Sequence, residues 1–232
     1  MIFQEPMSSL NPSLTCGYQV EEILLQHKKI SKKEAKILVI ELFNKVKLPR
    51  AAVIYNQYPH QLSGGMRQRV TIAIALACGP KILFADEPTT ALDVTVQAQI
   101  LDLLMLLKQQ DGMGMLFITH DLGVVAQTCD RVNVMYLGRL IEEGPVREVI
   151  RNPKHPYTQG LISALPKLDN LDQSLTAVPG DIPSPLERPP GCVFNTRCSQ
   201  IVGAACTTIG PNEVDLGADH TVACHIYKEV AE

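Results

Sequence analysis

The chain has 232 residues, of which 46% are hydrophobic, so it can build the core of one sizeable domain with an appendage. Its formal net charge is −3 and it has no dense Lys/Arg tract, which argues against a nucleic-acid-binding protein. No apolar run approaches the roughly 20 residues that a membrane-spanning helix needs, and no signal-peptide pattern opens the sequence, so we expect any membrane association to come through a partner.

The first residues have the pattern of a strand that runs into a loop. Met1-Ile2-Phe3 is apolar and is followed at once by polar Gln4-Glu5 and then by Pro6. Because these three residues look like the end of a longer core strand, the pattern indicates a truncated sequence. The alternative is a true half-domain, which would leave a sheet edge open and an apolar face unburied.

Two helices are predicted between Tyr18 and about Val46. Apolar residues recur there at helical spacing, and Ser31-Lys32-Lys33-Glu34 has the pattern of a capping box that starts the second helix. Leu48-Pro49 ends it. We assign these helices to a helical segment over about residues 11–78.

A phosphate seat is predicted at Ser63-Gly64-Gly65. These residues stand immediately before an apolar helix that Gly79-Pro80 ends. Backbone N–H groups exposed at a helix N-terminus attract a phosphate, and glycines have no Cβ to block its approach. Nearby, Arg67 and Arg69 are expected to be structural, although sensing of a nucleotide across an interface stays open, and His60 is expected to be a packing or capping residue.

Two adjacent acids follow the next apolar run. Ile82-Leu83-Phe84-Ala85 reads as a buried parallel strand that delivers Asp86-Glu87 to its C-terminal edge. One acid at such an edge can hold Mg²⁺, directly or through water, and its neighbour can polarise an attacking water. Together with the phosphate seat, this pattern indicates nucleotide chemistry.

A second buried strand is predicted over Met115 to Ile118, with Thr119-His120 at its end. Because the carboxyl ends of parallel strands meet at one edge of a sheet, we expect Gln4, Asp86-Glu87 and His120 to lie together there. Such an edge is where α/β proteins bind ligands.

The amino-acid composition of the chain changes after Arg151. Before that residue, a hairpin around Leu137-Gly138 and a short helix are predicted; from Asn152 onward the sequence becomes Pro-rich. Four of the seven cysteines also crowd into residues 192–224. We therefore divide the chain into residues 1–151 and a Pro-rich connector with a four-cysteine extension over residues 152–232.

The clustered thiols are candidate metal ligands. Thiolates are soft ligands that suit Zn²⁺ or an iron–sulfur cluster. The spacing lacks the paired CxxC of zinc ribbons, which disfavours zinc. Four reduced thiols in a loosely folded tail are the alternative, and disulfides are disfavoured in a cytoplasmic chain. The candidates are Cys192, Cys198, Cys206 and Cys224.

These motifs resemble those of ATP-binding cassette (ABC) ATPases. LSGGMRQR resembles the signature motif, ILFADEP the Walker B motif and TTALD the D-loop, while Gln4 with SLNP resembles the Q-loop and His120 the H-loop. Two longer segments are most similar to the ATPase subunits of peptide importers: YPHQLSGGMRQRV and DEPTTALDVTVQAQILDLL. The resemblance runs from Met1 to about Tyr227.

The resemblance implies an α/β fold: the C-terminal portion of an ABC ATPase domain, with a parallel sheet core, a helical subdomain and a small Cys-containing extension. It implies ATP and Mg²⁺ as cofactors, and in peptide-importer relatives the extension can hold a [4Fe–4S] cluster. The implied roles are general base for Glu87, Mg²⁺ binding for Asp86, γ-phosphate contact for His120, metal or water contact for Gln4, contact with a partner's ATP for Ser63, Gly64 and Gly65, and nucleotide contact along the subunit interface for Asp93.

The resemblance also implies partners. These are a second ABC ATPase subunit (as a homo- or heterodimer), transmembrane permease subunits and, indirectly, a substrate-binding protein, with no nucleic acid. The expected location is peripheral, on the cytoplasmic side of the cell membrane. The expected function is an ATP-hydrolysing subunit that powers peptide uptake, although nickel or other small solutes stay open as the cargo.

No Gly-x4-Gly-Lys-Ser/Thr occurs in the sequence, so the loop that cradles ATP phosphates is absent and this chain alone is expected to be inactive. Three alternatives stay open. A soluble ABC-type ATPase of DNA repair or translation predicts a basic surface. A non-catalytic subunit would only donate its signature motif to a partner, and a cluster-bearing sensor would carry an iron chromophore.

Overall fold

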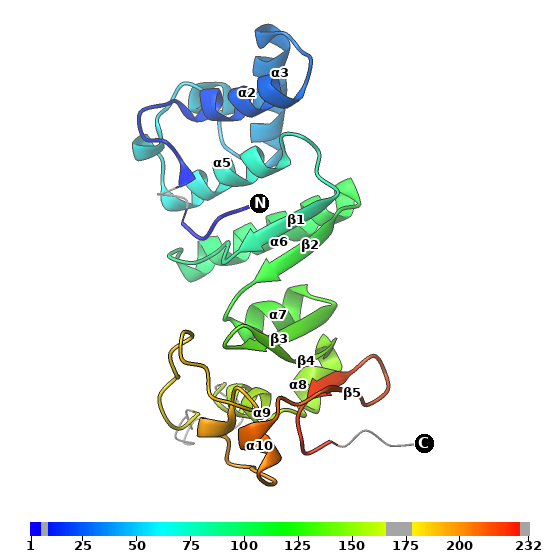
Figure 1. Cartoon of the computed structure of the whole chain (residues 1–232). Helices are drawn as coiled ribbons and strands as arrows, with labels where there is room; N and C mark the ends of the chain where they lie inside the picture. Colours follow the sequence, from blue (N-terminus) through cyan, green and yellow to red (C-terminus); the bar gives the residue numbers. More distant parts are fainter. Residues whose placement is uncertain (6–8, 166–177, 228–232) are drawn as a thin grey trace. The chain divides into compact units, whose positions relative to one another are not determined.

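The computed structural model describes residues 1–5, 9–165 and 178–227, and the chain forms two compact units (Figure 1). Unit 1 runs from Met1 to His120 and unit 2 from Asp121 to Glu232. Both units combine helices with strands, which agrees with the predicted α/β class. The predicted boundary between residues 151 and 152 separates two parts of the sequence that differ in composition, and it stays a prediction. The boundary between the two compact units lies between residues 120 and 121.

Unit 1 holds a short parallel sheet with helices packed on one face. Its elements are α2 (Cys16–His27), α3 (Lys32–Lys45), α4 (Ala51–Ile54), the 3₁₀-helix η1 (Pro59–Gln61), α5 (Gly64–Leu76), β1 (Ile82–Asp86), α6 (Val94–Asp111) and β2 (Gly114–Ile118).

β1 and β2 pair in parallel, with Asp86 opposite Ile118 at their carboxyl ends. Ile2 adds a single parallel bridge to Ala85, formed by the Ile2 N–H to Phe84 O at 2.8 Å and the Asp86 N–H to Ile2 O at 3.0 Å. The first residues of the chain therefore contact the sheet where the sequence predicted, through one bridge rather than a strand. This pairing brings three chain segments to one edge.

Each helix of the hairpin formed by α2 and α3 begins at a side-chain cap. The Thr15 side chain accepts the N–H of Tyr18, and Ser31 forms with Glu34 the capping box that the sequence predicted. The hydrogen bonds from Ser31 lower the pKa of the Glu34 carboxyl. Caps of this kind satisfy N–H groups that have no partner within the helix.

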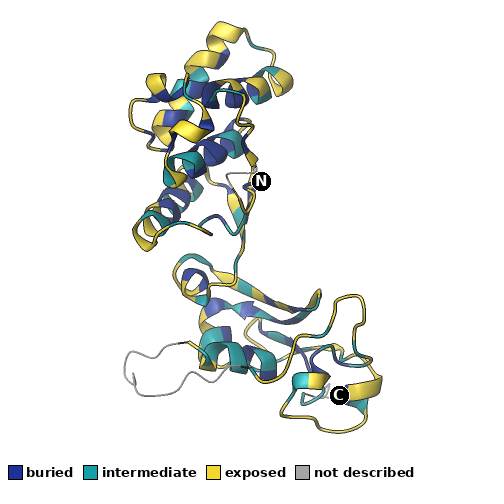
Figure 2. Ribbon diagram, turned by 90° about the vertical axis from the view of Figure 1, so that its left-hand side faces the viewer, coloured by how far each residue is buried: buried dark blue, intermediate teal, exposed yellow. Residues whose placement is uncertain are grey.

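The core of unit 1 is formed by residues of α2, α3, α5 and α6 and by the covered face of the sheet (Figure 2). Alternate residues of β1 are buried, as expected for a strand covered on one face. The largest fully buried side chains are Phe43, Ile2, Leu10, Leu24, Ile72, Leu83, Ile100, Leu103, Leu104 and Leu107.

Unit 2 is built on a four-stranded antiparallel sheet in the order β3-β4-β6-β5. The β3–β4 hairpin turns at Leu137-Gly138, as predicted. β4 lies before the predicted boundary between residues 151 and 152, and it pairs with β6, which lies after that boundary. The elements are α7 (Leu122–Thr128), β3 (Arg131–Tyr136), β4 (Arg139–Pro145), α8 (Val146–Arg151), α9 (Pro156–Ser163), the 3₁₀-helix η2 (Asn195–Arg197), α10 (Ala205–Thr208), β5 (Glu213–Asp215) and β6 (Thr221–Ala223).

An aromatic cluster forms the core of unit 2. Phe194 packs edge-on against Tyr136, with ring centroids 5.2 Å apart, and also contacts Tyr157 and His155. Burial lowers the pKa of His155 to about 4, so its ring is neutral at physiological pH, and its Nδ1 accepts the N–H of Tyr157 at 3.0 Å. The residues around Phe194 thus link the hairpin to α9 and to the cysteine-bearing segment.

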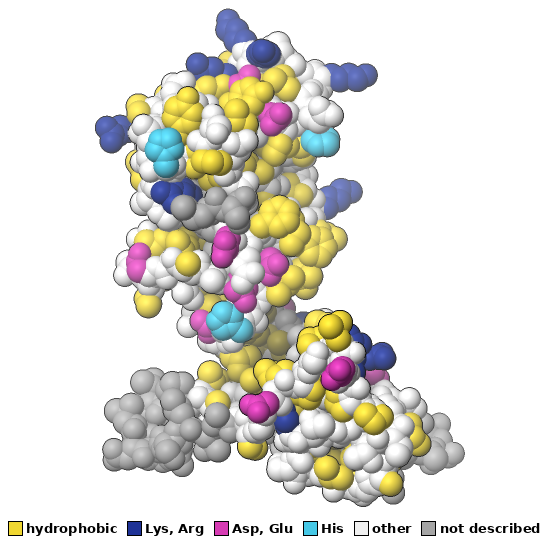
Figure 3. Space-filling model, turned by 60° about the vertical axis from the view of Figure 1, so that its left-hand side comes forward, with side chains coloured by type: hydrophobic (Ala, Val, Ile, Leu, Met, Phe, Trp, Pro, Cys, Tyr) yellow, Lys and Arg dark blue, Asp and Glu magenta, His cyan; other side chains and the backbone are white. Residues whose placement is uncertain are grey.

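Two surface properties bear on the predicted partners. Lys and Arg side chains project singly on the face drawn in Figure 3 and form no continuous basic patch there. In the described part of the chain, no helix has both the length and the apolarity needed to cross a membrane.

Candidate functional site

The carboxylate of Glu87 is the centre of a polar cluster at the carboxyl edge of the sheet. Gln4 Nε2 and Thr90 Oγ1 each donate to Glu87 Oε2 at 2.8 Å, and His120 Nδ1 lies 2.9 Å from Glu87 Oε1. The N–H of Glu87 donates to Ile118 O at 2.8 Å, which joins the residue to the end of β2. The structure thus brings together Gln4, Glu87 and His120, as predicted from their places at strand ends.

These contacts favour the ionised form of Glu87. Its pKa is lowered by the hydrogen bond from His120, then by those from Thr90 and Gln4. The side chain is one-fifth exposed, so solvent still reaches it. The carboxylate is therefore ionised and open to water, which is the state that a general base must have before it takes a proton.

The backbone of Glu87 is strained. Its φ of 42° lies in the left-handed region that residues other than glycine seldom adopt. The bond from Glu87 N–H to Ile118 O and the bond from Thr90 N–H to Glu87 O, at 3.1 Å, hold this conformation. Strain of this kind persists where surrounding contacts over-determine it, and it is concentrated at functional sites.

Asp86 lies beside this cluster as the last residue of β1. In the described part of the chain, its carboxylate forms no hydrogen bond with another residue, and it is neither fully buried nor fully exposed. Carboxylate oxygens are the ligands that Mg²⁺ takes in nucleotide sites, usually together with several waters. Asp86 is therefore the acid of the pair whose oxygens stay available for a cation.

The predicted phosphate seat forms the N-terminus of α5. Ser63 is the N-cap, its Oγ accepts the N–H of Met66 at 3.4 Å, and Gly64 and Gly65 are the first helical residues. Ser63 and Gly64 are exposed. Asp93, in contrast, caps α6 through the Val96 N–H at 2.9 Å, so its contact with a nucleotide stays a prediction.

Gly65 brings the starts of α5 and α6 together. A Cβ at Gly65 would lie only 2.6 Å from Val96 Cγ1, whereas one at Gly64 would lie 3.4 Å from Leu92 Cδ2. We expect Gly65→Ala to lower the free energy of unfolding by about 1–3 kcal/mol, because overpacking forces side chains to shift. Adding Val96→Ala should restore most of this loss, and Gly64→Ala should be neutral or stabilising in urea denaturation. Equal losses for the two glycines would contradict the steric explanation.

Sequence reasoning did not single out Thr90. Its hydroxyl donates to the side chain of Glu87, three residues earlier, rather than to the backbone, so the turn preferences of Ser and Thr would not have indicated it. Arg67 Nε donates to Pro59 O at 2.7 Å and an Arg69 guanidinium nitrogen donates to Val46 O at 2.8 Å. These bonds agree with the expected structural role of the two arginines.

The four candidate metal-binding cysteines lie near one another in unit 2, since Cys198 and Cys206 contribute to raising the pKa of both Cys192 and Cys224. Burial, together with the smaller effect of the other three thiols, raises the pKa of the Cys224 thiol to about 11. Cys192, Cys198 and Cys224 each accept a backbone N–H from the residue two positions later, at 3.4 Å for Cys198. Cys192, Cys206 and Cys224 are buried.

The predicted cluster site is not supported by the positions of these side chains. Within residues 1–5, 9–165 and 178–227, no group of three or more His, Cys, Asp or Glu side chains is arranged to hold a metal ion. The four thiols are all free, without disulfides.

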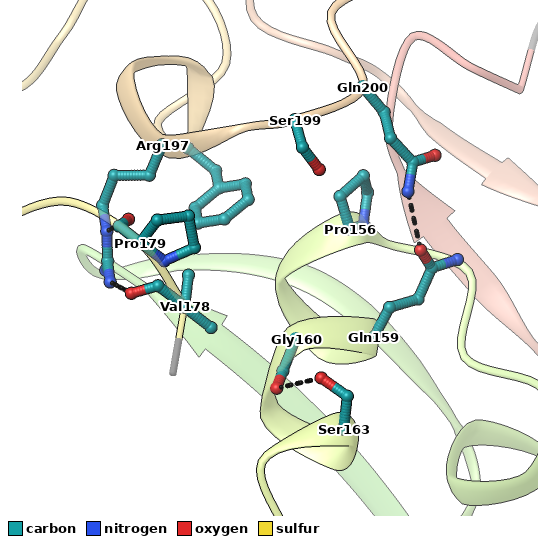
Figure 4. Close-up of a pocket in the computed structure, with 10 residues that line it drawn as sticks. Pro156, Gln159, Gly160, Ser163, Val178, Pro179, Arg197, Ser199 and Gln200 are labelled. Atoms are coloured by element: carbon teal, nitrogen blue, oxygen red, sulfur yellow. Dashed lines mark hydrogen bonds between the residues drawn. The ribbon is translucent and has the colours of Figure 1, made fainter. Parts of the chain in front are cut away.

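A separate pocket of about 250 Å³ lies between α9 and the segments around Val178 and Arg197 (Figure 4). Its polar groups mostly bond to one another: Gln200 Nε2 donates to Gln159 Oε1 at 2.8 Å, and the Arg197 guanidinium donates to Val178 O and Pro179 O. None of the predicted nucleotide-site residues lines it.

Comparison with known proteins gives consistent matches. The ABC transporter model matches residues 1–90, and the model for the oligopeptide/dipeptide transporter C-terminal region matches residues 141–206. The oligopeptide transport ATP-binding protein of Bacillus subtilis is 50% identical over 99% of this chain and 70% of its own length. The dipeptide transport ATP-binding protein of the same organism is 48% identical over 100% of this chain and 69% of its own length.

Two solved structures of ABC proteins are similar to this chain in fold and sequence. The dimeric ATP-binding cassette MJ0796 bound to ADP and phosphate has a TM-score of 0.54 and 34% identity, over 63% of this chain and 62% of that one. The cbiO1 protein of Clostridium perfringens, part of an ABC transporter complex, has a TM-score of 0.57 and 30% identity, over 65% of this chain and 58% of that one.

Proposed function

Since the chain belongs to the family of peptide-import ATP-binding proteins, the ATPase subunits of ABC transporters, we propose that it hydrolyses ATP to power peptide uptake by such an importer. The observation that carries this proposal is the convergence of Gln4, Thr90 and His120 on the Glu87 carboxylate, beside Asp86. The alternative of a soluble ATPase of DNA repair or translation is not favoured, because the relatives are importer subunits.

We assign the steps as follows. Glu87 takes a proton from water as the water oxygen attacks the γ-phosphorus, and the bond from that phosphorus to the β–γ bridging oxygen breaks. Asp86 would hold the Mg²⁺, which supplies charge neutralisation at the phosphates when bound. His120 and Gln4 orient Glu87 and contact the terminal phosphate and the water.

The exposed start of α5 supports an assembly of two ATPase subunits. Ser63, Gly64 and Gly65 would contact an ATP held by a second ATPase subunit, and the dimeric solved cassettes support pairing of this kind. We propose that the pair acts on transmembrane permease subunits and is bound peripherally at the cytoplasmic side of the membrane. A substrate-binding protein would deliver the cargo.

Peptide uptake tests this function. In cells whose own peptide-importer ATPase is deleted, the chain completed with the phosphate-binding loop that its sequence lacks and expressed with its permease partners should restore uptake of a labelled peptide, whereas the same completed chain with Glu87→Gln should not. Labelled nickel serves as the second cargo. Uptake of nickel without peptide would replace the proposed substrate, and equal uptake with Glu87→Gln would overturn the proposed role of the site.

We propose further that Cys192, Cys198, Cys206 and Cys224 are ligands of a [4Fe–4S] cluster. The support is chemical: the thiols are soft ligands, they lie within electrostatic range of Cys224, and three of them accept backbone N–H groups, as the sulfurs of cluster-bound cysteines do. The side-chain positions described above would have to shift for all four to meet at one cluster.

Metal analysis tests the cluster. Chain purified without oxygen is expected to contain about four iron atoms and to absorb broadly in the visible range. Cys224→Ser should reduce both signals, while Cys78→Ser, at an exposed cysteine of unit 1, should not. Zinc in place of iron, or neither metal, would contradict the proposal.

A further inference from the structure

The pocket of about 250 Å³ in unit 2 contains a positive charge that no acidic residue balances. Among the described residues that line it, Arg197 is the only charged one, and it is partly buried. In the described part of the chain the Arg197 guanidinium forms no ion pair and donates only to neutral oxygens, those of Val178, Pro179 and Tyr136. Because moving a charge away from water without an opposite charge is costly, this pocket favours an anionic ligand.

The guanidinium of Arg197 is held in place and still has donors to offer. Its Nε donates to Pro179 O at 2.9 Å, one terminal nitrogen donates to Val178 O at 2.8 Å, and the other donates to Tyr136 Oη at 3.4 Å. An arginine side chain has five N–H groups, so two remain after these three bonds. A carboxylate accepts such groups in charge-assisted hydrogen bonds, and a side chain that is already held loses little freedom on binding.

Beside this charge, the pocket has apolar walls and one hydroxyl without a partner. Phe194, which is 2% exposed, forms part of the wall together with Pro156 and Val178. The Ser199 hydroxyl points toward the space between Pro156 and Pro179 (Figure 4), and it has no hydrogen-bond partner among the described residues. A hydroxyl in this place can donate to a ligand oxygen.

The size of the pocket limits what can bind there. Sites for drug-sized ligands have about 300–1,000 Å³, and this pocket is smaller, with about 250 Å³. We propose that it binds a small organic monocarboxylate with an apolar body. The carboxylate accepts from Arg197 and Ser199, and the body contacts Phe194, Pro156 and Val178. A free ammonium group on the same ligand would find no acidic side chain among the described lining residues.

Titration calorimetry of the full chain with three probes tests the class of ligand. N-acetyl-L-leucine has a carboxylate and an apolar body, N-acetyl-L-leucinamide lacks the charge, and acetate lacks the body. We expect N-acetyl-L-leucine to bind at least about tenfold more tightly than the other two, because a charged hydrogen bond and a buried side chain each contribute a factor of this order. Equal binding of the amide or of acetate would contradict the proposal, and no binding of N-acetyl-L-leucine at about 10 mM would overturn it.

Two pairs of variants test whether the ligand lies in this pocket. Arg197→Gln should weaken the binding of N-acetyl-L-leucine by about 10- to 100-fold. Arg147→Gln removes the same charge from an exposed position of α8 and should leave binding unchanged. Because Arg197 also holds the backbone at Val178 and Pro179, Ser199→Phe is the second variant. Its ring should fill the pocket and abolish binding while Arg197 stays in place, whereas Ser199→Ala should weaken binding only about two- to tenfold.

The outcomes separate this inference from the proposed function. Binding that is unchanged in Ser199→Phe would place the ligand elsewhere and overturn the site, whatever the effect of Arg197→Gln. The proposed nucleotide-site residues Gln4, Asp86, Glu87 and His120 belong to unit 1, and none of them lines this pocket. The calorimetric result therefore stands or falls independently of ATP hydrolysis.

Discussion

Glu87→Gln, in the chain completed with the phosphate-binding loop that its sequence lacks, is expected to lower ATP hydrolysis by about 100- to 10,000-fold while ATP binding is retained, as is typical for loss of a general base. Glutamine keeps the length of the side chain, and its oxygen can still accept from Thr90 or His120. It cannot take a proton from water, however, which is the role that the ionised Glu87 carboxylate has in the proposed reaction. Because binding is intact and turnover is blocked, the two ATPase subunits should stay associated around ATP.

Phosphate release by the completed chain, assembled with its transporter partners, measures this effect, and nucleotide binding is measured on the same sample. Glu41→Gln, at an exposed acid of α3, is the control and should leave both unchanged. Hydrolysis at the wild-type rate in Glu87→Gln would remove Glu87 from the role of base.

The candidate site was largely predictable because its members end neighbouring strands. Parallel strands place their carboxyl ends at one edge, so Glu87 and His120 could be placed together from two apolar runs, and Gln4 from a third. The caps at Ser31 and Ser63 were predictable for a similar reason, since they depend on residues within four positions of one another. Local pattern and parallel order were sufficient for these features.

Other features depend on contacts that no local pattern encodes. The left-handed backbone of Glu87 follows from bonds to Ile118 and Thr90 that exist only once β1 and β2 have paired. The pairing of β4 with β6 joins Glu142 to Val222 across the Pro-rich connector. Gln19 has the pattern of an ordinary polar residue on a helix, yet it is buried and bonds to the backbone of Asn11 and Leu14, atoms that any residue would supply.

Glu142 in unit 2 shows most clearly a contact that the local sequence does not predict. An acidic residue in a strand of an antiparallel sheet suggests a position that faces solvent. Instead it is 1% exposed and accepts three hydrogen bonds of 2.8 Å from residues distant in the sequence. Its Oε1 is bonded by the N–H of Lys154 and faces His220 Nε2, and its Oε2 accepts the N–H of His155. One carboxylate thus joins β4, the start of α9 and the segment leading to β6.

Glu142→Ala is therefore expected to destabilise unit 2 by about 3–5 kcal/mol, the cost of breaking a buried charged contact by removing one partner. The N–H groups of Lys154 and His155 and the ring nitrogen of His220 would lose their acceptor inside the protein, where water cannot replace it. In hydrogen exchange, β6 and the start of α9 should lose protection, whereas the helices of unit 1, which have a separate core, should keep theirs.

The next residue in the strand supplies a matched control for this prediction. Glu143 is partly exposed and pairs with Arg131 at 3.0 Å on the surface, so Glu143→Ala should cost less than about 1 kcal/mol. Urea denaturation followed by hydrogen exchange in unit 2 compares the two variants directly. If both acids cost the same, the three buried hydrogen bonds contribute no more than a surface ion pair, and Glu142 does not hold the extension to the hairpin. A large difference means that this single carboxylate, rather than the short β4–β6 pairing alone, attaches the cysteine-bearing segment to the rest of unit 2.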